Sequence, residues 1–341
     1  MVIRMIETPY LIFIGDIVER LGVKTGLGIM EWRGERCAGQ YRLTPDAVDL
    51  GLPDMDPAAA AAAGVRTMVI GGASFGGALP PEWVGAVLAA IDAGLDVASG
   101  LHDRLGDHGE IAARAKERGV TLHDVRGLPI GTRPTVGSGR KRSGKRVLMV
   151  GTDCAVGKKF TALALERDAR AAGLAATFRA TGQTGVLISG GGVAIDAVVA
   201  DFLSGVVETL SPDAAPDHWD VVEGQGSLLH PAYAAVSLGL LHGSQPDAIV
   251  LCHEAGRETL IGYPDYPIQP LDHCIDVHLV NGRLTNPDIR CVGISLNTSA
   301  LSSEARVRAI GSIEQRLGLP CVDPAVTGTG PIIAALQKVG H

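Results

Sequence analysis

The sequence predicts an α/β protein of two domains, each built on a parallel sheet, and the second domain carries a P-loop. The chain has 341 residues, which suggests about two domains at roughly 150 residues each. Apolar runs alternate with Ala-rich helical patterns, as in strand–helix–strand units. The stretch GTDCAVGKKFT at 151–161 lies between an apolar run and a helical pattern, which is the context of a phosphate-binding loop.

In the first domain, apolar segments bounded by Gly alternate with helical patterns. The expected strands are 8–15, 65–72 and 95–102, the expected helices are 56–64, 80–94 and 109–119, and 121–127 closes the domain. The segment 80–94 has a Pro start, a Gly stop and apolar residues at helical spacing (Trp83, Val87, Ala90, Ile91). The first strand is followed by FIGDIVERLG rather than GxGxxG, so an NAD site is poorly supported. We interpret GGASFGG at 71–77 as a turn at the carboxyl end of a strand.

Residues 130–146 differ from both flanks, because they carry six basic residues, four Gly and no acidic residue. We interpret this stretch as a solvated linker, with phosphate steering as the alternative. The predicted division is a first domain at 1–130, a basic linker at 131–146 and a P-loop domain at 147–341. The strands expected in the P-loop domain are 146–151, 176–182, 219–226, 246–253, 275–281, 292–297 and 320–325.

Composition excludes several classes of function. The net charge of −7 gives no basic field for nucleic acid. The longest stretch without acidic residues, Lys or Arg, at 224–246, contains Gln225, His230 and Pro231, so we do not expect a membrane span. No secretory signal is evident. The six Cys form no CxxC pair and fit no zinc spacing, so we expect a reduced, cytoplasmic protein without a metal site.

The P-loop motif predicts phosphate binding without a metal ion. Backbone N–H groups at the start of the following helix point at an anion, and Lys158 adds charge. Lys159 occupies the position where a nucleotide-hydrolysing loop carries the Ser or Thr that ligates magnesium, and Thr161 lies about 200° further around the helix. Coenzyme A would suit such a loop. The residues expected to bind coenzyme A are Gly151, Thr152, Asp153, Cys154, Ala155, Val156, Gly157, Lys158, Lys159, Phe160 and Thr161. Lys158 and the helix N-terminus would also lower the pKa of Cys154, which would allow an acetyl-cysteine intermediate. The alternative is that Cys154 is only a small residue that fills the turn.

Several segments carry a family resemblance. GTDCAVGKK resembles the GTDT-x-x-GKT loop of dethiobiotin synthetase, and VVEGQGSL at 221–228 and TGQTG at 181–185 follow in the same order as the matching segments of that enzyme. With IGGASFGGALPPEW at 70–83 and AGLDVASGLHDRL at 93–105, almost the whole chain resembles a bacterial family of D-glutamate N-acetyltransferases of the DgcN type. The resemblance implies a Rossmann-like N-terminal domain followed by a P-loop NTPase-like domain. It also implies acetyl transfer from acetyl-CoA to an acidic amino acid in D-amino acid catabolism.

Acetyl transfer to an amine needs a base near the ammonium and cationic partners for the two glutamate carboxylates. Glu223 and His253 are the candidate bases, because both follow strands at the edge where α/β sheets bind ligands. The alternatives are a phosphate- or metal-site carboxylate for Glu223 and a structural role for His253. The candidate substrate-binding residues are Arg179, Arg257 and Lys24, with Gln183 and Thr184 as neutral donors.

Two other functions remain open from the residues. An ATP-dependent ligase or kinase would follow the dethiobiotin synthetase likeness, but the missing magnesium ligand argues against it. A nucleotide-sensing protein without catalysis is the other. For a metabolic enzyme we expect small-molecule partners only and a homo-oligomer, whose number of chains the sequence does not fix.

Overall fold

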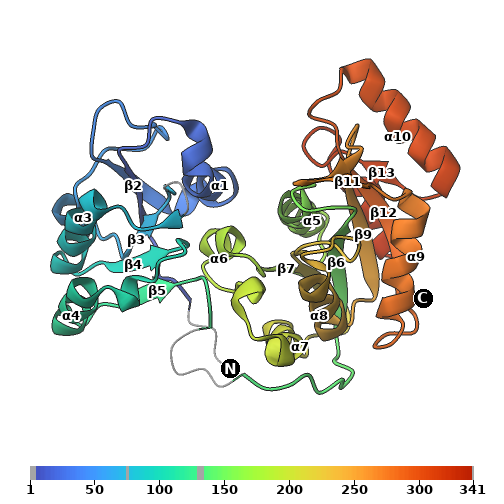
Figure 1. The fold of residues 1–341 in the computed structure, drawn as a ribbon, viewed down its shortest axis with the longest axis horizontal. Coiled ribbons are helices and arrows are strands. Elements are labelled where there is room, and N and C mark those ends of the chain that lie inside the picture. The colour runs from blue at the N-terminus through green and yellow to red at the C-terminus, as the bar shows by residue number, and fades with distance from the viewer. Residues whose placement is uncertain (1–4, 74–76, 129–133, 340–341) are drawn as a thin grey trace. The chain divides into compact units, whose positions relative to one another are not determined.

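The computed structural model describes residues 5–73, 77–128 and 134–339. The chain forms two compact units, one of residues 1–132 with 182–197, the other of residues 133–181 with 198–341. Strands and helices interleave in both, so the predicted α/β class is confirmed (Figure 1). The linear division of the sequence did not include the return segment, residues 182–197, in the first unit. Within the described ranges, no helix has the length and apolar character needed to cross a bilayer.

The first unit is a five-stranded parallel sheet of order β2-β1-β3-β4-β5. Its strands are β1 (Tyr10–Gly15), β2 (Cys37–Arg42), β3 (Thr67–Ile70), β4 (Asp96–Ser99) and β5 (Leu122–Asp124). Its helices are α1 (Lys24–Arg33), α2 (Pro57–Ala62), α3 (Pro81–Asp92) and α4 (Gly109–Arg118), and the return segment adds α6 (Gln183–Ser189). Short 3-10 turns lie at Arg20–Val23, Gly34–Arg36, Leu105–Asp107 and Ile195–Ala197. Strand β2 was not predicted, because CAGQYR has few large apolar residues and lies at the sheet edge.

Trp83 on α3 is the centre of the first unit's core. The face predicted from helical spacing is confirmed, since Trp83, Val87, Ala90 and Ile91 are all buried. The Trp83 ring meets Phe13 edge-on at 5.2 Å, and its Nε1–H donates to Asp16 Oδ1 at 2.9 Å. Truncating such a buried aromatic typically costs about 3–5 kcal/mol. Of the predicted turn 71–77, residues 74–76 lie outside the described residues.

The second unit is a six-stranded parallel sheet of order β13-β12-β9-β6-β8-β7. The strands are β6 (Lys145–Gly151), β7 (Ala176–Arg179), β8 (Trp219–Val222), β9 (Ala248–Glu254), β12 (Arg290–Asn297) and β13 (Cys321–Val322), with a separate hairpin of β10 (Thr259–Leu260) and β11 (Tyr263–Pro267). The helices are α5 (Lys158–Ala171), α7 (Ala200–Leu210), α8 (Ala234–Ser244), α9 (Leu271–Gly282), α10 (Ser303–Leu317) and α11 (Gly330–Leu336).

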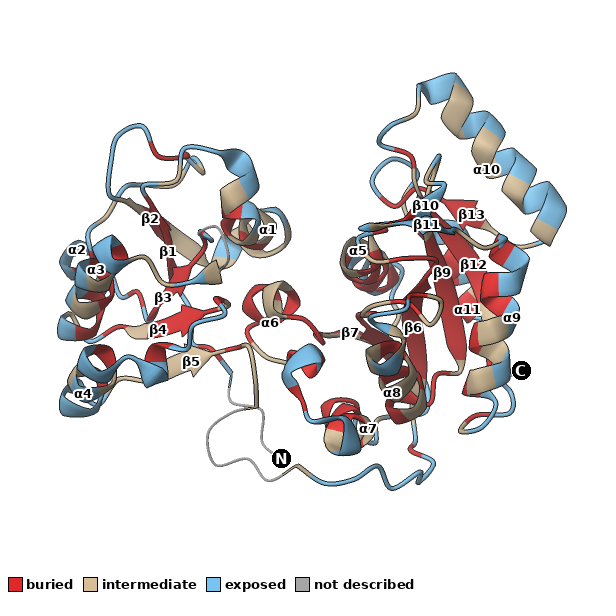
Figure 2. Ribbon diagram, viewed as in Figure 1, coloured by how far each residue is buried: buried red, intermediate tan, exposed pale blue. Residues whose placement is uncertain are grey.

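The helices of the second unit form two packed groups. α5 packs with α11, while α7, α8 and α9 pack in a row. Burial runs along β6, β8 and β9, as expected for parallel strands covered on both faces (Figure 2). The predicted strand 275–281 is wrong, because these residues belong to α9. A crossover is needed between the parallel neighbours β9 and β12, and α9 supplies it with Cys274, Ile275 and His278 buried.

The predicted solvated linker is wrong for two of its arginines. Arg142 is buried and donates to the backbone carbonyls of Glu208, Ser211 and Gly243. Burial and the neighbouring Arg146 lower the pKa of Arg142 to about 10. Arg146 lies in β6, is also buried, and donates to Ser211 Oγ at 2.9 Å. The Arg142 guanidinium thereby holds carbonyls at the C-terminal ends of α7 and α8 in the P-loop unit. Residues 131–133 of the linker lie outside the described residues.

Candidate functional site

The P-loop runs from the end of β6 to the start of α5, as the motif predicted. Gly157 precedes the helix with φ +99°, a left-handed conformation that favours glycine, and Ala155 has φ +54°. The backbone N–H groups of the first turn of α5 therefore begin directly after the loop. This geometry suits an anion at the helix N-terminus.

Lys158 is buried inside the loop. Its Nζ donates to the Asp153 carbonyl at 2.7 Å, and burial lowers its pKa. The glycine of the VVEGQG segment makes room for this side chain, since a Cβ at Gly224 would lie 2.8 Å from Lys158 Cδ and 1.7 Å from the Met149 carbonyl oxygen. Gly224 and Lys158 can therefore pack this closely because position 224 carries no side chain.

Arg257 ties the P-loop to the loop that follows β9. Its Nη1 donates to Asp153 Oδ2 and to the Cys154 carbonyl, both at 2.7 Å, and its Nη2 donates to Glu254 Oε2 at 2.5 Å. The backbone N–H of Ile261 also donates to Asp153 Oδ2, at 2.8 Å. Two carboxylates thus face the guanidinium of Arg257, the residue that we expected from the sequence to bind the substrate. Nothing in the sequence pattern indicated the contact with Ile261.

His253 lies at the end of β9 beside the P-loop. Its Nδ1 shares a hydrogen bond with Thr152 Oγ1 at 3.0 Å. Burial lowers the pKa of His253, and the nearby Arg257 lowers it further, against an opposite effect of Glu254. The imidazole is therefore neutral at pH 7, with Nε2 on the side away from Thr152. A neutral imidazole is able to accept a proton.

Glu223 follows β8 and is buried. Its Oε2 accepts the Thr181 N–H at 2.9 Å, and Thr181 Oγ1 donates to the Glu223 carbonyl at 2.7 Å. Glu223 thereby fixes the chain where it leaves β7, one residue before the return segment begins. These contacts suit a positioning role for Glu223 within the second unit.

The predicted substrate ligands do not gather in one unit. Arg179 donates to Asp220 Oδ1 at 2.7 Å, and because Arg179 pairs with Val222 in the sheet, its side chain runs back toward the amino half of β8. Lys24 begins α1, and Gln183 and Thr184 begin α6, so these three residues belong to the first unit.

Cys154 does not have the activated thiol that the sequence suggested. Burial raises its pKa, which outweighs the lowering effect of Lys158, and Asp153 raises it further. The expectation of a lowered pKa is therefore wrong, and the structure gives the acetyl-cysteine intermediate no support. A helix N-terminus and nearby cations lower the pKa of a thiol, but burial raises it, and at Cys154 burial has the larger effect.

In the part of the chain that the structure describes, Asp153, Cys154 and His230 are the group with ligand atoms close enough for a metal ion. However, His230 Nδ1 accepts the Ala232 N–H at 3.1 Å, so a neutral His230 carries its proton on Nε2. That nitrogen is buried without a hydrogen-bond partner among the described residues, 3.9 Å from Asp153 Oδ1. A protonated Nε2 is a donor and not a metal ligand, so we assign no metal here.

Thr161 cannot replace the missing magnesium ligand. Its Oγ1 donates to the Gly157 carbonyl at 3.0 Å or shares a hydrogen bond with Ser295 Oγ at 2.7 Å, and it is buried against the sheet. The hydroxyl is therefore occupied on the side of the helix that faces β12.

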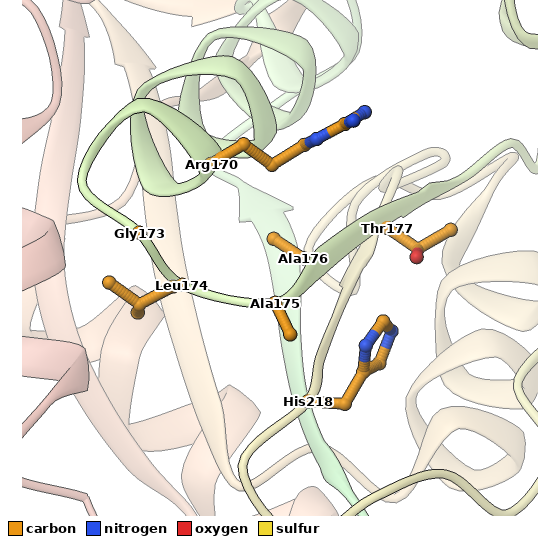
Figure 3. A pocket seen from close by; sticks show the side chains of 7 residues that line it. All are labelled: Arg170, Gly173, Leu174, Ala175, Ala176, Thr177 and His218. Atoms are coloured by element: carbon orange, nitrogen blue, oxygen red, sulfur yellow. The ribbon is translucent and has the colours of Figure 1, made fainter.

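The described residues of the second unit line two hollows of ligand size. One of about 490 Å³ is lined by residues around the start of β7, including Arg170, Thr177 and His218 (Figure 3). It lies at the amino edge of the sheet, opposite the edge where parallel sheets bind ligands. The other, of about 450 Å³, is lined by His253 and Arg257 and so adjoins the P-loop.

Comparison with known proteins places these features in a family. Residues 135–333 match "Domain of unknown function (DUF1611_C) P-loop domain", and residues 35–128 match "Domain of unknown function (DUF1611_N) Rossmann-like domain". The chain is 48% identical to a D-glutamate N-acetyltransferase of Tritonibacter scottomollicae, over 98% of this chain and 100% of that one. It is 45% identical to a D-glutamate N-acetyltransferase of a Pseudoalteromonas species, over 97% and 99%. A crystal structure of a DUF1611 family protein from Anabaena variabilis matches with a TM-score of 0.82 and 31% identity, over 97% of this chain and 100% of that one.

Proposed function

The chain belongs to the DUF1611 family, and from this premise we propose that it transfers the acetyl group of acetyl-CoA to the amine of D-glutamate. The observation that carries the proposal is the likeness to two enzymes of that activity along almost the whole chain, both units included. The family predicted from the sequence is thereby confirmed, and the protein is an acyltransferase. The degradation of D-amino acids is the process that such a reaction would serve.

In this proposal the P-loop holds the phosphates of acetyl-CoA. The first N–H groups of α5 and the Lys158 ammonium supply donors and positive charge. Acyl transfer breaks no phosphate bond, so the loop needs no magnesium ligand, and Lys159 in that position adds to the charge that neutralises the pyrophosphate. The engaged Thr161 hydroxyl supports the same assignment.

We assign the proton transfer to His253 and treat Glu223 as the residue that positions the chain at Thr181. His253 Nε2 takes one proton from the D-glutamate ammonium, and the freed amine attacks the thioester carbonyl. A C–N bond forms, the C–S bond breaks, and the second proton on the nitrogen passes to the leaving thiolate. The imidazolium returns its proton to solvent, so the products are N-acetyl-D-glutamate, CoA thiol and one proton.

The test is release of free thiol from acetyl-CoA by the purified protein, followed with a thiol reagent. We expect release that depends on D-glutamate, with L-glutamate as the matched control for chirality. Parallel calorimetry compares acetyl-CoA with Mg-ATP. Tight binding of Mg-ATP with neither binding nor turnover of acetyl-CoA would overturn the proposal in favour of a ligase, a kinase or a sensor.

A further inference from the structure

The cavity beside the P-loop has a lining that the P-loop assignment does not use. It measures about 450 Å³ and lies wholly in the second unit, between the end of β9, the start of α9 and the last turns of α10. Its apolar wall includes Ile268, Leu271 and Ile313. Its polar groups are His253, Arg257, Glu258, Gln269 and Arg316. A cavity of this size accommodates a small metabolite with part of a second ligand.

The two arginines of the cavity differ in how strongly they are engaged. Arg257 has a side chain only 14% exposed and holds Asp153 and Glu254 in close ion pairs. Arg316 has a side chain 51% exposed, and its nearest carboxylate among the described residues, Asp272 Oδ1, is 3.7 Å away. An ion pair at such distance and exposure contributes little. Arg316 is therefore the cation in this lining that is available to an incoming carboxylate.

The α9 N-terminus adds favourable potential for the same anion. This helix of 12 residues starts at Leu271, in the cavity wall, and no side chain of the described residues caps it. Its first N–H groups and its dipole favour negative charge. The cavity itself, with Arg316, is the main evidence for a site, and the helix end only adds to it.

Glu258 decides between the ligands that this cavity would accept. An exposed carboxylate in the lining repels a ligand that is only anionic, such as the phosphorylated ribose of CoA. It attracts a ligand that also carries an ammonium. Together with one available arginine and apolar walls, this lining is complementary to an amino acid whose side chain has methylene groups and a terminal carboxylate.

We propose that this cavity is the acceptor site, where Glu258 and His253 Nε2 face the ammonium of D-glutamate, Arg316 binds a carboxylate, and Leu271 and Ile313 cover the methylene groups. The inference rests on the proposed function and extends it to the recognition of the acceptor. The arm between the CoA diphosphate and its thioester has about 13 bonds, which reach about 16 Å when extended and less when folded. A thioester carried by a donor at the P-loop therefore reaches His253.

The experiment compares Arg316→Gln and Glu258→Gln with wild type, and uses Arg308→Gln as the control. Arg308 lies on the same helix α10 with a side chain 72% exposed, and it does not line the cavity. We expect KM for D-glutamate to rise about 10- to 150-fold in R316Q, since a hydrogen bond to a charged group contributes about 1.5–3 kcal/mol and about 1.4 kcal/mol corresponds to a factor of ten. KM for acetyl-CoA stays unchanged, and R308Q behaves as wild type.

Glutarate, which lacks the ammonium, provides a second readout. In E258Q we expect KM for D-glutamate to rise while glutarate becomes the better inhibitor, because the repulsive carboxylate is gone. A rise in KM for acetyl-CoA with D-glutamate unaffected would place the donor's nucleotide end in the cavity and overturn the inference. Unchanged constants for both substrates would also overturn it. If wild type releases no thiol, the proposed function fails, and calorimetry of D-glutamate with wild type and R316Q still decides whether the cavity binds this amino acid.

Discussion

Replacing Lys158 by Met tests whether the P-loop holds the phosphates of acetyl-CoA. Met retains a long unbranched side chain and removes the buried ammonium. A charge-assisted contact with phosphate contributes about 1.5–3 kcal/mol. We therefore expect KM and Kd for acetyl-CoA to rise about 10- to 150-fold, since about 1.4 kcal/mol corresponds to a factor of ten. KM for D-glutamate should stay close to wild type.

Although K158M weakens the binding of acetyl-CoA, it should stabilise the folded protein, because it removes the cost of burying the ammonium. The size of this stabilisation depends on pH. Burial lowers the pKa of Lys158 from 10.5, so between the lowered pKa and 10.5 the unfolded chain binds more protons than the folded one. The stability of wild type therefore rises with pH in that window, and the cost of the buried charge is present in full only below the lowered pKa. We expect the urea midpoint of K158M relative to wild type to fall as pH is raised from about 7 to about 10.

Thiol release and calorimetry measure the binding effect, and urea titrations at several pH values measure the stability effect. Lys338→Met is the matched control, because Lys338 is exposed in the same unit. Wild-type affinity of K158M for acetyl-CoA would refute the phosphate assignment. A stability difference that does not change with pH would refute the argument about the buried ammonium.

Three further predictions follow from the contacts described. In wild type, kcat/KM should rise with pH through an apparent pKa below 6.5, since burial lowers the pKa of His253. H253Q should lose this rise in the pH profile and should also lose about 10²–10⁴-fold in kcat. An unchanged pH profile in H253Q would contradict the assignment of His253 as the base. Arg142→Met should lower the free energy of unfolding in urea by about 3 kcal/mol, at about 1 kcal/mol for each of the three carbonyls that lose their donor. The control Arg140→Met removes an exposed side chain and should leave the urea midpoint close to that of wild type. At pH 7.5, iodoacetamide should react with Cys154 more slowly than it reacts with the thiol of free glutathione, because burial raises the pKa of Cys154. A faster reaction at Cys154 would contradict the raised pKa.

Periodicity and turn residues predicted most of the architecture. The helical face of α3, the parallel strands and the strand–loop–helix context of the P-loop follow from local patterns, because burial repeats with the period of each element. The error at 275–281 has a physical cause. IDVHLVN is short, apolar and rich in β-branched residues, so a buried strand and a segment of a buried helix read alike.

The candidate site was predictable only where a motif marks it. The loop residues 151–161 and the Gly224 segment have spacing that reflects backbone geometry. No sequence spacing predicts the partners of Arg179 and Arg257, because an arginine pairs with whichever carboxylate the fold brings near. These carboxylates are Asp220 for Arg179 and Asp153 for Arg257. Arg316 stands near the end of an amphipathic helix with no motif around it. Only the tertiary structure brings it to the same cavity as His253.

The return segment has a consequence for synthesis on the ribosome. The first unit is not complete when residue 132 has emerged, because α6 supplies Val186, Leu187 and Ile188 as buried residues and packs against α1. Ile6 N–H donates to the Gly190 carbonyl at 2.7 Å, so even the first described residues wait for this segment. The nascent N-terminal chain thus exposes apolar surface until the return segment has also been made. A truncated chain that ends in the linker would retain this defect permanently, whereas one that ends after residue 197 would carry β6, α5 and β7 without the rest of their sheet.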